Sequence, residues 1–329
     1  MYSFRRLALL FSVLTVSLLL FQGGLVSTMV LGQKKGPVRI TLTDQQKSGK
    51  QEKGKNPFDG KFAMKSLEKI CAIGTRISGT KGMLKQQEIL IKHFEKLGAK
   101  VKKQSFQARH PITRKMVTLT NLIVQFYPDK KKRILFCTHY DTRPRPDRDP
   151  TNPNGVFLGA NDGASGCGLL MELGKHIKNR SGLYGIDFVF FDGEEFVYQR
   201  PRDPLFRGST FFAETYAKQR AKARTNPKQK SDEPIYVCGI LLDMIGDKHL
   251  DLYWEKNSYH YAKDLTTSIW FTAFIADPAP ASSPSSNSFS AIASKAGRAL
   301  ANAALLPEAK MDNVPSPARI VPPDTGASK

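Results

Sequence analysis

The stretch Phe157-Leu-Gly-Ala-Asn-Asp-Gly-Ala-Ser-Gly-Cys-Gly-Leu-Leu-Met-Glu-Leu173 decides the fold of this chain. Its first half is a loop of small residues that holds a single acid, Asp162. Its second half carries leucines at helical spacing as far as Ile177, which predicts an apolar helix. The same placement of acids, where a strand-like or turn segment ends, occurs four times along the chain.

Three further runs of β-branched and aromatic residues also end in acids or a histidine. The runs and the polar residues after them are 134–138 with His139 and Asp141, 186–191 with Asp192, Glu194 and Glu195, and 235–242 with Asp243. Because these runs alternate with helical patterns, they predict an α/β fold built on an open sheet. Binding sites in such sheets lie at the carboxyl ends of the strands, where separate loops converge.

Histidine and carboxylate side chains gathered from several strand ends are suitable ligands for zinc. His139 and Asp141 are two residues apart, so both point the same way on an extended segment. Asp141 can then accept a hydrogen bond from the second ring nitrogen of His139 and orient the ring for a metal. The adjacent Glu194 and Glu195 can divide two roles between them, metal ligand and acid/base.

Each acid taken singly has a simpler interpretation. An Asp or Glu after a strand is usually a helix cap or a solvated turn residue, and paired glutamates usually form a solvated face. The metal-site hypothesis depends on the four fragments taken together.

As an ordered set, the fragments resemble the zinc exopeptidases of metallopeptidase family twenty-eight. The resemblance is carried by His139-Tyr-Asp141, Gly159-Ala-Asn-Asp162, Phe191-Asp-Gly-Glu-Glu195 and Leu242-Asp-Met-Ile-Gly246, and it covers about Lys65 to Trp270. The branch it resembles most is the glutaminyl-peptide cyclotransferases, because Phe191–Phe196 followed by Asp203–Ser209 is similar to their form of this loop. The resemblance implies a three-layer α/β/α sandwich around a mostly parallel mixed sheet.

A cyclotransferase-like mechanism assigns a role to each acid. The resemblance implies that Asp162 and Glu195 bind one zinc, and that Glu194 is the general base and acid. Glu194 would take a proton from the substrate's α-amine as it attacks the γ-carboxamide, and would return the proton to the departing ammonia. Asp243 would hold the amine or the proton network.

A zinc aminopeptidase is the alternative enzyme. In that interpretation His139, Asp162 and Asp243 hold a second zinc, and Glu194 activates a water that bridges the two metals. The ligand set allows both enzymes, whereas the loop from Glu195 to Ser209 favours the cyclotransferase.

The resemblance fails at one point. Relatives supply a late histidine as the third ligand of the cyclotransferase zinc, but no histidine follows His260 here. We therefore expect an incomplete carboxyl-terminal part of the fold, and an inactive product is a third alternative.

Composition divides the chain into four segments. Arg5 and Arg6 precede an apolar run, so residues 1–32 are predicted to be a signal peptide or an amino-terminal anchor. Residues 33–57 read as a basic flexible linker and 58–270 as the enzyme-like domain, while 271–329 form a low-complexity tail that is predicted to be disordered. The chain is expected to be exported, to the periplasm or the extracellular space, or to stay membrane-anchored.

The expected substrates are the amino-termini of peptides or proteins. The chain has a formal net charge of +21, but it contains no basic motif interleaved with aromatic residues. No nucleic-acid partner is therefore expected. Membrane contact is expected only through an uncleaved amino-terminal segment, and no pattern indicates an oligomeric state.

Helix and strand signals also precede the site. They predict helices that end at Gly74 and Gly98, and strands over 100–106 and 117–126. The four cysteines are compatible with export. Cys137 and Cys167 lie close to where some cyclotransferases carry a bridged pair, although buried free cysteine is a common core residue.

Overall fold

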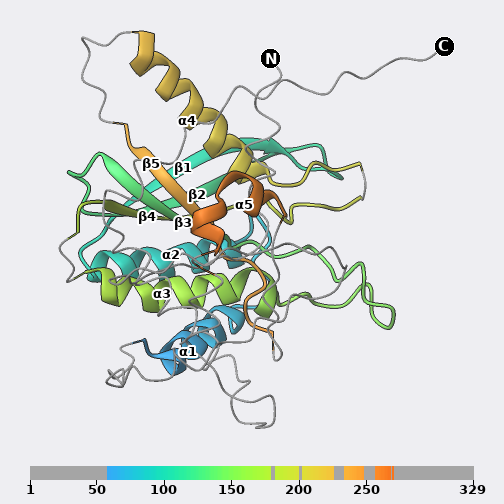
Figure 1. The fold of residues 1–329 in the computed structure, drawn as a ribbon. Helices are drawn as coiled ribbons and strands as arrows, with labels where there is room; N and C mark the ends of the chain where they lie inside the picture. The colour runs from blue at the N-terminus through green and yellow to red at the C-terminus, as the bar shows by residue number, and fades with distance from the viewer. Residues whose placement is uncertain are drawn as a thin grey trace, which may run out of the picture.

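A computed structural model of the chain describes residues 58–178, 182–199, 202–225, 233–247, 256–267 and 269 (Figure 1). The signal peptide or anchor predicted for 1–32, the linker predicted for 33–57 and the tail predicted for 271–329 lie outside these residues. The description below concerns the enzyme-like domain.

Five strands form one mixed sheet. They are β1 (Lys100–Arg109), β2 (Met116–Phe126), β3 (Lys132–His139), β4 (Gly185–Phe191) and β5 (Ile235–Leu241), in the order β1-β2-β4-β3-β5. β3 pairs in parallel with β4 and β5, whereas β2 pairs antiparallel with β1 and β4. Among these strands β2 alone runs against the others, so the predicted mostly parallel mixed sheet is confirmed.

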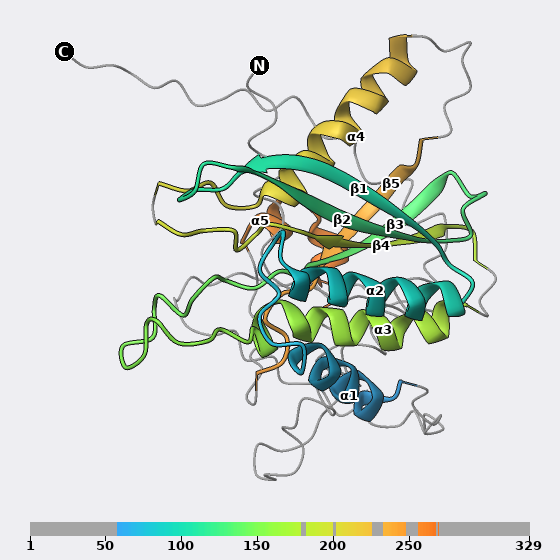
Figure 2. The ribbon, with the colours of Figure 1, turned by 180° about the vertical axis from the view of Figure 1, so that it is seen from behind.

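Helices cover both faces of the sheet, which confirms the three predicted layers (Figures 1 and 2). One face carries α2 (Lys81–Lys96) and α3 (Ser165–Ile177), with α1 (Gly60–Cys71) packed outside α3, and the opposite face carries α4 (Arg207–Thr225). A π-helical turn, η4 (Ala160–Ala164), leads into α3, and the short α5 (Lys256–Tyr261) follows β5 in the chain.

Apolar side chains fill both spaces between sheet and helices, because alternate residues of a strand face opposite ways. Towards α2 and α3, the ring of Phe94 stands edge-on to Phe126 and Phe188, at 6.4 and 5.8 Å between centroids. Towards α4, Phe191 packs on Phe212 at 5.6 Å. The strands that carry the site are therefore anchored from both faces.

The first two helices begin and end at sequence-encoded signals. A side-chain oxygen of Asp59 accepts from the N–H of Phe62 at 3.1 Å, and α2 is capped in the same way by Thr80. Gly74 and Gly98 follow the helices with φ of +88° and +83°, a left-handed conformation that favours glycine. α1 ends at Cys71, three residues before the predicted Gly74, and α2 ends at Lys96, two residues before the predicted Gly98.

All four cysteines lie within the described residues, and all are free thiols. Cys137 on β3 belongs to the core on the α4 face, whereas Cys167 on α3 belongs to the core on the opposite face. The sheet separates the two sulfurs, so the bridge suggested by the resemblance is not formed. Burial raises the pKa of Cys167 to about 12, as expected of an inert core thiol.

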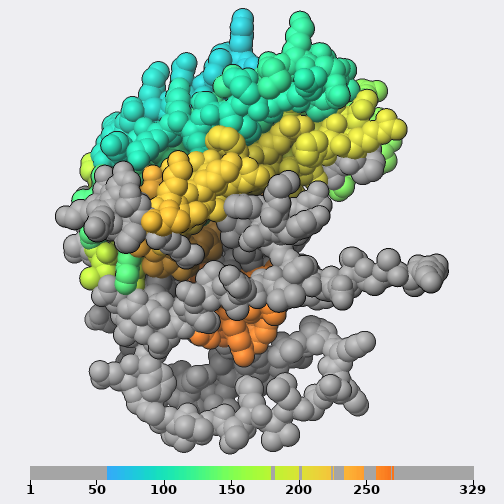
Figure 3. Space-filling model, turned by 90° about the horizontal axis from the view of Figure 1, so that it is seen from above, coloured from blue at the N-terminus to red at the C-terminus, as the bar shows by residue number. Residues whose placement is uncertain are grey.

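The edge strand β1 is exposed along one side of the sheet. Figure 3 shows this side, with β1 and β2 in teal and green beside α4 in yellow. Phe106 of β1 stacks on Phe211 of α4 at 4.6 Å between centroids. Lys100, Lys102 and Lys103 are exposed along β1, and such charges discourage strands of other chains from pairing with an open edge. Within the described residues, no helix has both the length and the apolar composition that crossing a bilayer needs.

Candidate metal centre and the pocket beside it

The parallel strands deliver their polar residues to one edge of the sheet, as the sequence predicts. β3 ends at His139, β4 is followed by Glu194 and Glu195, and β5 is followed by Asp243. Asp162 reaches the same edge from η4, the turn that the small residues of the opening stretch allow. Gly163 in this turn has φ of +96°, and a Cβ there would meet the ring of His139 at 3.1 Å.

Three of these side chains form a group that could hold a metal ion. Nε2 of His139 lies 2.9 Å from Oδ1 of Asp162 and 3.4 Å from Oδ1 of Asp243. One ligand atom from each residue falls within 4.8 Å of the others, and no other such group occurs among the described residues. The set matches the ligands that the resemblance assigns to the second zinc of an aminopeptidase.

The polar atoms of this group fit a cation. Within the described part of the chain, the buried Nε2 of His139 and Oδ1 of Asp243 have no hydrogen-bond partner. Buried polar atoms are costly unless they are satisfied, and an imidazole nitrogen with two carboxylates is a ligand set that zinc accepts. A divalent ion between them would satisfy these atoms.

The carboxylates also raise the pKa of the His139 imidazole when no ion is bound. Burial opposes protonation of His139, but the negative charges of Glu194, Asp141, Asp162 and Asp243 outweigh burial and raise its pKa well above the usual value. A metal would take the place of this proton, since metal ligation requires neutral histidine.

Asp141 lies beside His139 and also anchors the loop with the two glutamates. Its Oδ1 is 3.5 Å from Nδ1 of His139. Its two oxygens accept from the backbone N–H groups of Glu194 and Glu195, at 3.2 and 2.9 Å. One fully buried carboxylate thereby anchors the turn after β4 and lies beside the histidine ring.

Glu194 lies close to the metal group, and its ionised carboxylate form is destabilised there. Burial raises the pKa of Glu194 to about 8, and although His139 acts in the opposite direction, Asp243 and Asp141 raise it further. A carboxyl group with such a pKa can take and return a proton near neutral pH, which is what a general base and acid requires.

Glu195 lies outside the group of three. Its carboxylate forms a bidentate ion pair with Arg143, with Nε to Oε2 at 2.5 Å and Nη2 to Oε1 at 2.7 Å. The hydrogen bonds to Glu195 raise the pKa of Arg143, although burial acts against them. The sequence provides no signal for this pair, because its partners are separated by 52 residues.

A buried network beneath the site was also missed by sequence reasoning. The hydroxyl of Ser78 donates to Oδ1 of Asp192 at 2.6 Å, and the N–H of Thr120 donates to Oδ2 at 2.7 Å. Burial and the neighbouring charge of Asp141 raise the pKa of Asp192 to about 7, despite these hydrogen bonds. Asp192 thus links the loop of the two glutamates to β2 and to the turn before α2.

Arg76 fixes the loop that carries Asp162. Its fully buried guanidinium donates to the backbone oxygens of Leu158 and Gly159, and to the side chain of Gln86. Its backbone N–H donates to the hydroxyl of Thr142 at 2.8 Å. A single arginine therefore joins the turn before α2, the end of β3 and the approach to η4.

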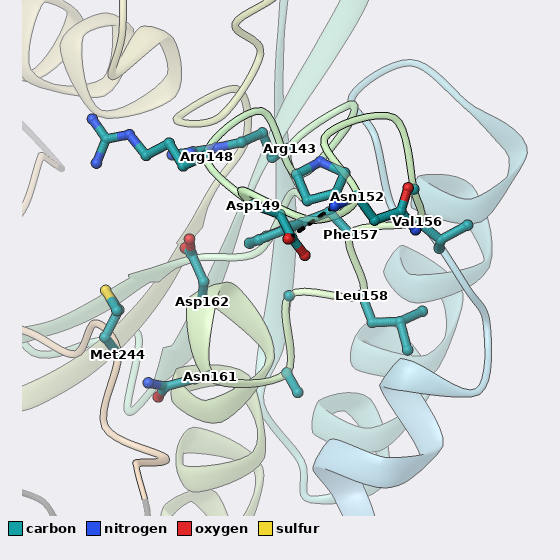
Figure 4. Close-up of a pocket in the computed structure, with 14 residues that line it drawn as sticks. Arg143, Arg148, Asp149, Asn152, Val156, Phe157, Leu158, Asn161, Asp162 and Met244 are labelled. Atoms are coloured by element: carbon teal, nitrogen blue, oxygen red, sulfur yellow. Dashed lines mark hydrogen bonds between the residues drawn. The ribbon is translucent and has the colours of Figure 1, made fainter.

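An open pocket of about 540 Å³ adjoins the metal group (Figure 4). Asp162 lies on its wall together with Met244, which follows Asp243. The segment from Arg143 to Leu158 supplies most of the remaining wall. Val156, Leu158 and Met244 are 71%, 45% and 54% exposed, so the pocket presents apolar side chains to solvent beside the carboxylates.

Comparison with known proteins identifies similar sequences. The sequence profile of Peptidase family M28 matches residues 121–297, more than half of the chain. A glutaminyl-peptide cyclotransferase from Bothrops jararaca is 29% identical over 184 residues, which cover 52% of this chain and 45% of that protein. The chain thus spans about half the length of the curated relatives that it matches first.

Solved structures with the same fold extend further along the chain. The crystal structure of Fimbriiglobus ruber glutaminyl cyclase is 32% identical with a TM-score of 0.64, and covers 74% of this chain and 94% of that one. A leucine aminopeptidase precursor from Bacteroides thetaiotaomicron is 23% identical with a TM-score of 0.61, covers 76% and 98%, and shows the shared fold.

Proposed function

This chain belongs to Peptidase family M28, and from that premise we propose that it is a zinc-dependent glutaminyl-peptide cyclotransferase. It would convert an amino-terminal glutaminyl residue of a peptide or protein into pyroglutamate and release ammonia. The observation that carries the choice of reaction is the 32% identity to a glutaminyl cyclase over 94% of that chain. The placement of Glu194 beside a group that could hold a metal supports metal-assisted acid/base catalysis, which both candidate enzymes share.

Zinc held by His139, Asp162 and Asp243 would supply a Lewis acid that polarises the γ-carboxamide carbonyl of the substrate. Glu194 accepts a proton from the α-amine while the amine nitrogen forms a bond to the γ-carbon. The bond from this carbon to the amide nitrogen then breaks, and Glu194 returns the proton to the leaving nitrogen, which departs as ammonia. Asp141 holds Glu194 in place through the backbone throughout.

The open pocket would receive the rest of the peptide. Val156, Leu158 and Met244 offer apolar contacts to the side chains that follow the amino-terminal residue, while Asp162 faces the same space. We also propose that the chain meets its substrates after export, through the amino-terminal segment predicted for 1–32.

One specific observation favours a second function, a zinc aminopeptidase. The three side chains that the structure brings together, His139, Asp162 and Asp243, are the set assigned to the second metal of such an enzyme. In this alternative Glu194 would activate a water that attacks a peptide carbonyl, and no pyroglutamate would form.

A single pair of substrates separates the two functions. The purified full chain with zinc is incubated with a peptide that begins with glutamine and with an aminoacyl amide. The proposal expects ammonia release from the peptide with the corresponding loss of mass, and no such activity in Glu194→Gln with zinc retained. Hydrolysis of the amide without cyclisation would establish the aminopeptidase, and turnover by Glu194→Gln would contradict the role of Glu194 in either.

A further inference from the structure

Two buried carboxylates face the same hydroxyl group beneath the candidate site. Asp141 and Asp192 are 0% and 1% exposed, and Ser78, in the turn before α2, is 3% exposed. The hydroxyl oxygen of Ser78 lies 2.6 Å from Oδ1 of Asp192 and 3.4 Å from Oδ2 of Asp141. Because a serine hydroxyl has a single hydrogen, it can donate to only one of these carboxylates at a time.

Backbone N–H groups from separate segments also bind the two carboxylates. Asp141 accepts from Glu194 and Glu195, at 3.2 and 2.9 Å, so it holds the turn after β4. Asp192 accepts from the N–H of Thr120 at 2.7 Å, so it is held by β2. The position of Glu194 therefore depends on Asp141, and Ser78 joins Asp141 to an acid that β2 holds in place.

The two carboxylates would repel each other strongly if both were ionised. Burial and the charge of Asp141 raise the pKa of Asp192 to about 7, while the hydrogen bond from Ser78 acts in the opposite direction. Tyr140 also lies near Asp192, but burial raises the pKa of this phenol well above its usual value, so it stays neutral. Two buried carboxylates in such a position favour a state in which they hold one proton.

One arrangement of hydrogens satisfies all three side chains. A protonated Asp192 donates to the oxygen of Ser78, and the hydrogen of Ser78 turns towards Asp141. The charge then rests on Asp141, which is the carboxylate that accepts from the turn of Glu194.

We propose that Ser78 and Asp192 are positioning residues, which hold the Asp141 carboxylate, and through it Glu194, as part of one hydrogen-bonded pair of acids. The inference rests on the role of Glu194 in the proposed function. It extends that function to a serine and an aspartate that do not line the pocket.

The first test replaces Ser78 by alanine in the full chain. Ser78→Ala leaves the two carboxylates without a hydroxyl between them, so their repulsion should displace the turn of Glu194. Misplacement of a catalytic group is costly, so kcat for ammonia release from a peptide that begins with glutamine should fall roughly ten- to hundredfold. KM should change little, because Ser78 does not line the pocket. Ser66→Ala is the matched control, since Ser66 is a buried serine of α1, and it should keep the wild-type kcat.

The second test separates positioning from a merely structural role. In Asp192→Asn the amide nitrogen can donate to Ser78 and the oxygen can accept from Thr120, as a protonated Asp192 would. This variant should keep kcat within roughly threefold of wild type, and adding it to Ser78→Ala should recover most of the lost turnover, because one of the two charges is gone.

The pH dependence provides an independent measurement. The deficit of Ser78→Ala, expressed as its kcat divided by that of wild type, should deepen as the pH rises through the pKa of Asp192, about 7, because both carboxylates are then ionised. The double variant should show no such trend, since its amide does not ionise.

The outcomes distinguish this inference from the proposed function. A wild-type kcat in Ser78→Ala would overturn the inference alone, as would a loss of turnover that Asp192→Asn does not relieve. If the wild-type chain hydrolyses an aminoacyl amide without releasing ammonia, only the proposed function fails, and the same ratios are measured for hydrolysis, in which Glu194 also acts. A chain with neither activity would overturn both. Thermal unfolding verifies that each variant is folded, and if Ser78→Ala fails to fold, Asp192→Asn decides, because the inference requires it to remain active.

Discussion

At the scale of single residues, Asp141 anchors the loop of the two glutamates beside the candidate histidine ligand. Its carboxylate accepts from two successive backbone N–H groups, those of Glu194 and Glu195, and lies beside Nδ1 of His139. Asp141→Asn replaces one oxygen by an amide nitrogen, which cannot accept a hydrogen bond. We expect about a ten- to hundredfold loss of both zinc affinity and kcat, as is usual when a residue that supports a metal ligand is changed.

The measurements for Asp141→Asn are chelator competition and steady-state ammonia release. Asp129→Asn is a suitable control, because Asp129 is exposed in the turn between β2 and β3, at the end of β3 away from the site. If Asp141→Asn retained wild-type zinc affinity and turnover, the anchoring role assigned to Asp141 would be wrong.

Residues whose function depends on the end of a strand could be predicted from the sequence. His139, Asp162 and Asp243 were found because apolar runs mark their strands and turns, and the structure brings them together. Arg143 and Arg76 could not be found in this way. Their partners come from distant segments, and an arginine in an irregular loop looks like a solvated residue until the fold buries it.

At the scale of elements, a buried ion pair stabilises the sheet near the amino ends of β3 and β4, at the opposite end of these strands from the site. Arg133 of β3 contacts Asp187 of β4 at 2.6 Å, and these side chains are 2% and 0% exposed. The guanidinium also donates to the backbone oxygens of Phe126 and Ile186, while Tyr236 donates to Asp187. This network therefore ties β2, β3, β4 and β5 together.

Removal of one partner of this pair should be costly. Arg133→Met leaves Asp187 buried and short of its main counter-charge, so we expect the free energy of unfolding to fall by about 3–5 kcal/mol. The double variant Arg133→Met with Asp187→Asn should recover part of this loss, because a neutral amide is less costly to bury than a carboxylate. Urea unfolding of the four proteins checks this, and strictly additive losses would argue against the coupling.

At the scale of the whole molecule, the sequence predicts the layers better than it predicts how they are joined. The alternation of apolar runs and helical patterns predicts an open α/β sheet, since burial on both faces of a parallel sheet demands apolar strands, and the family resemblance adds the three layers. The single antiparallel strand β2 depends on strand order and direction, and the opposite-face positions of Cys137 and Cys167 depend on the face against which α3 packs; no local pattern encodes either.

The metal group joins segments that are far apart in the chain, so an ion there should stabilise the folded domain as a whole. His139 ends β3, Asp162 precedes α3 and Asp243 follows β5, and a cation bound only in the folded state shifts the unfolding equilibrium by mass action. With free zinc at a hundred times its dissociation constant, the gain is about 2.7 kcal/mol.

We therefore expect a chelator to lower the Tm of the wild-type chain and added zinc to restore it. His139→Ala should have a lower Tm without zinc and should lose this response, because the metal group is left with two carboxylates. Arg145→Gln, which leaves the group intact, should respond like wild type. An equal zinc-dependent shift in His139→Ala would mean that the ion binds elsewhere, since stabilisation by a ligand at this edge of the sheet requires the only imidazole among the three ligands.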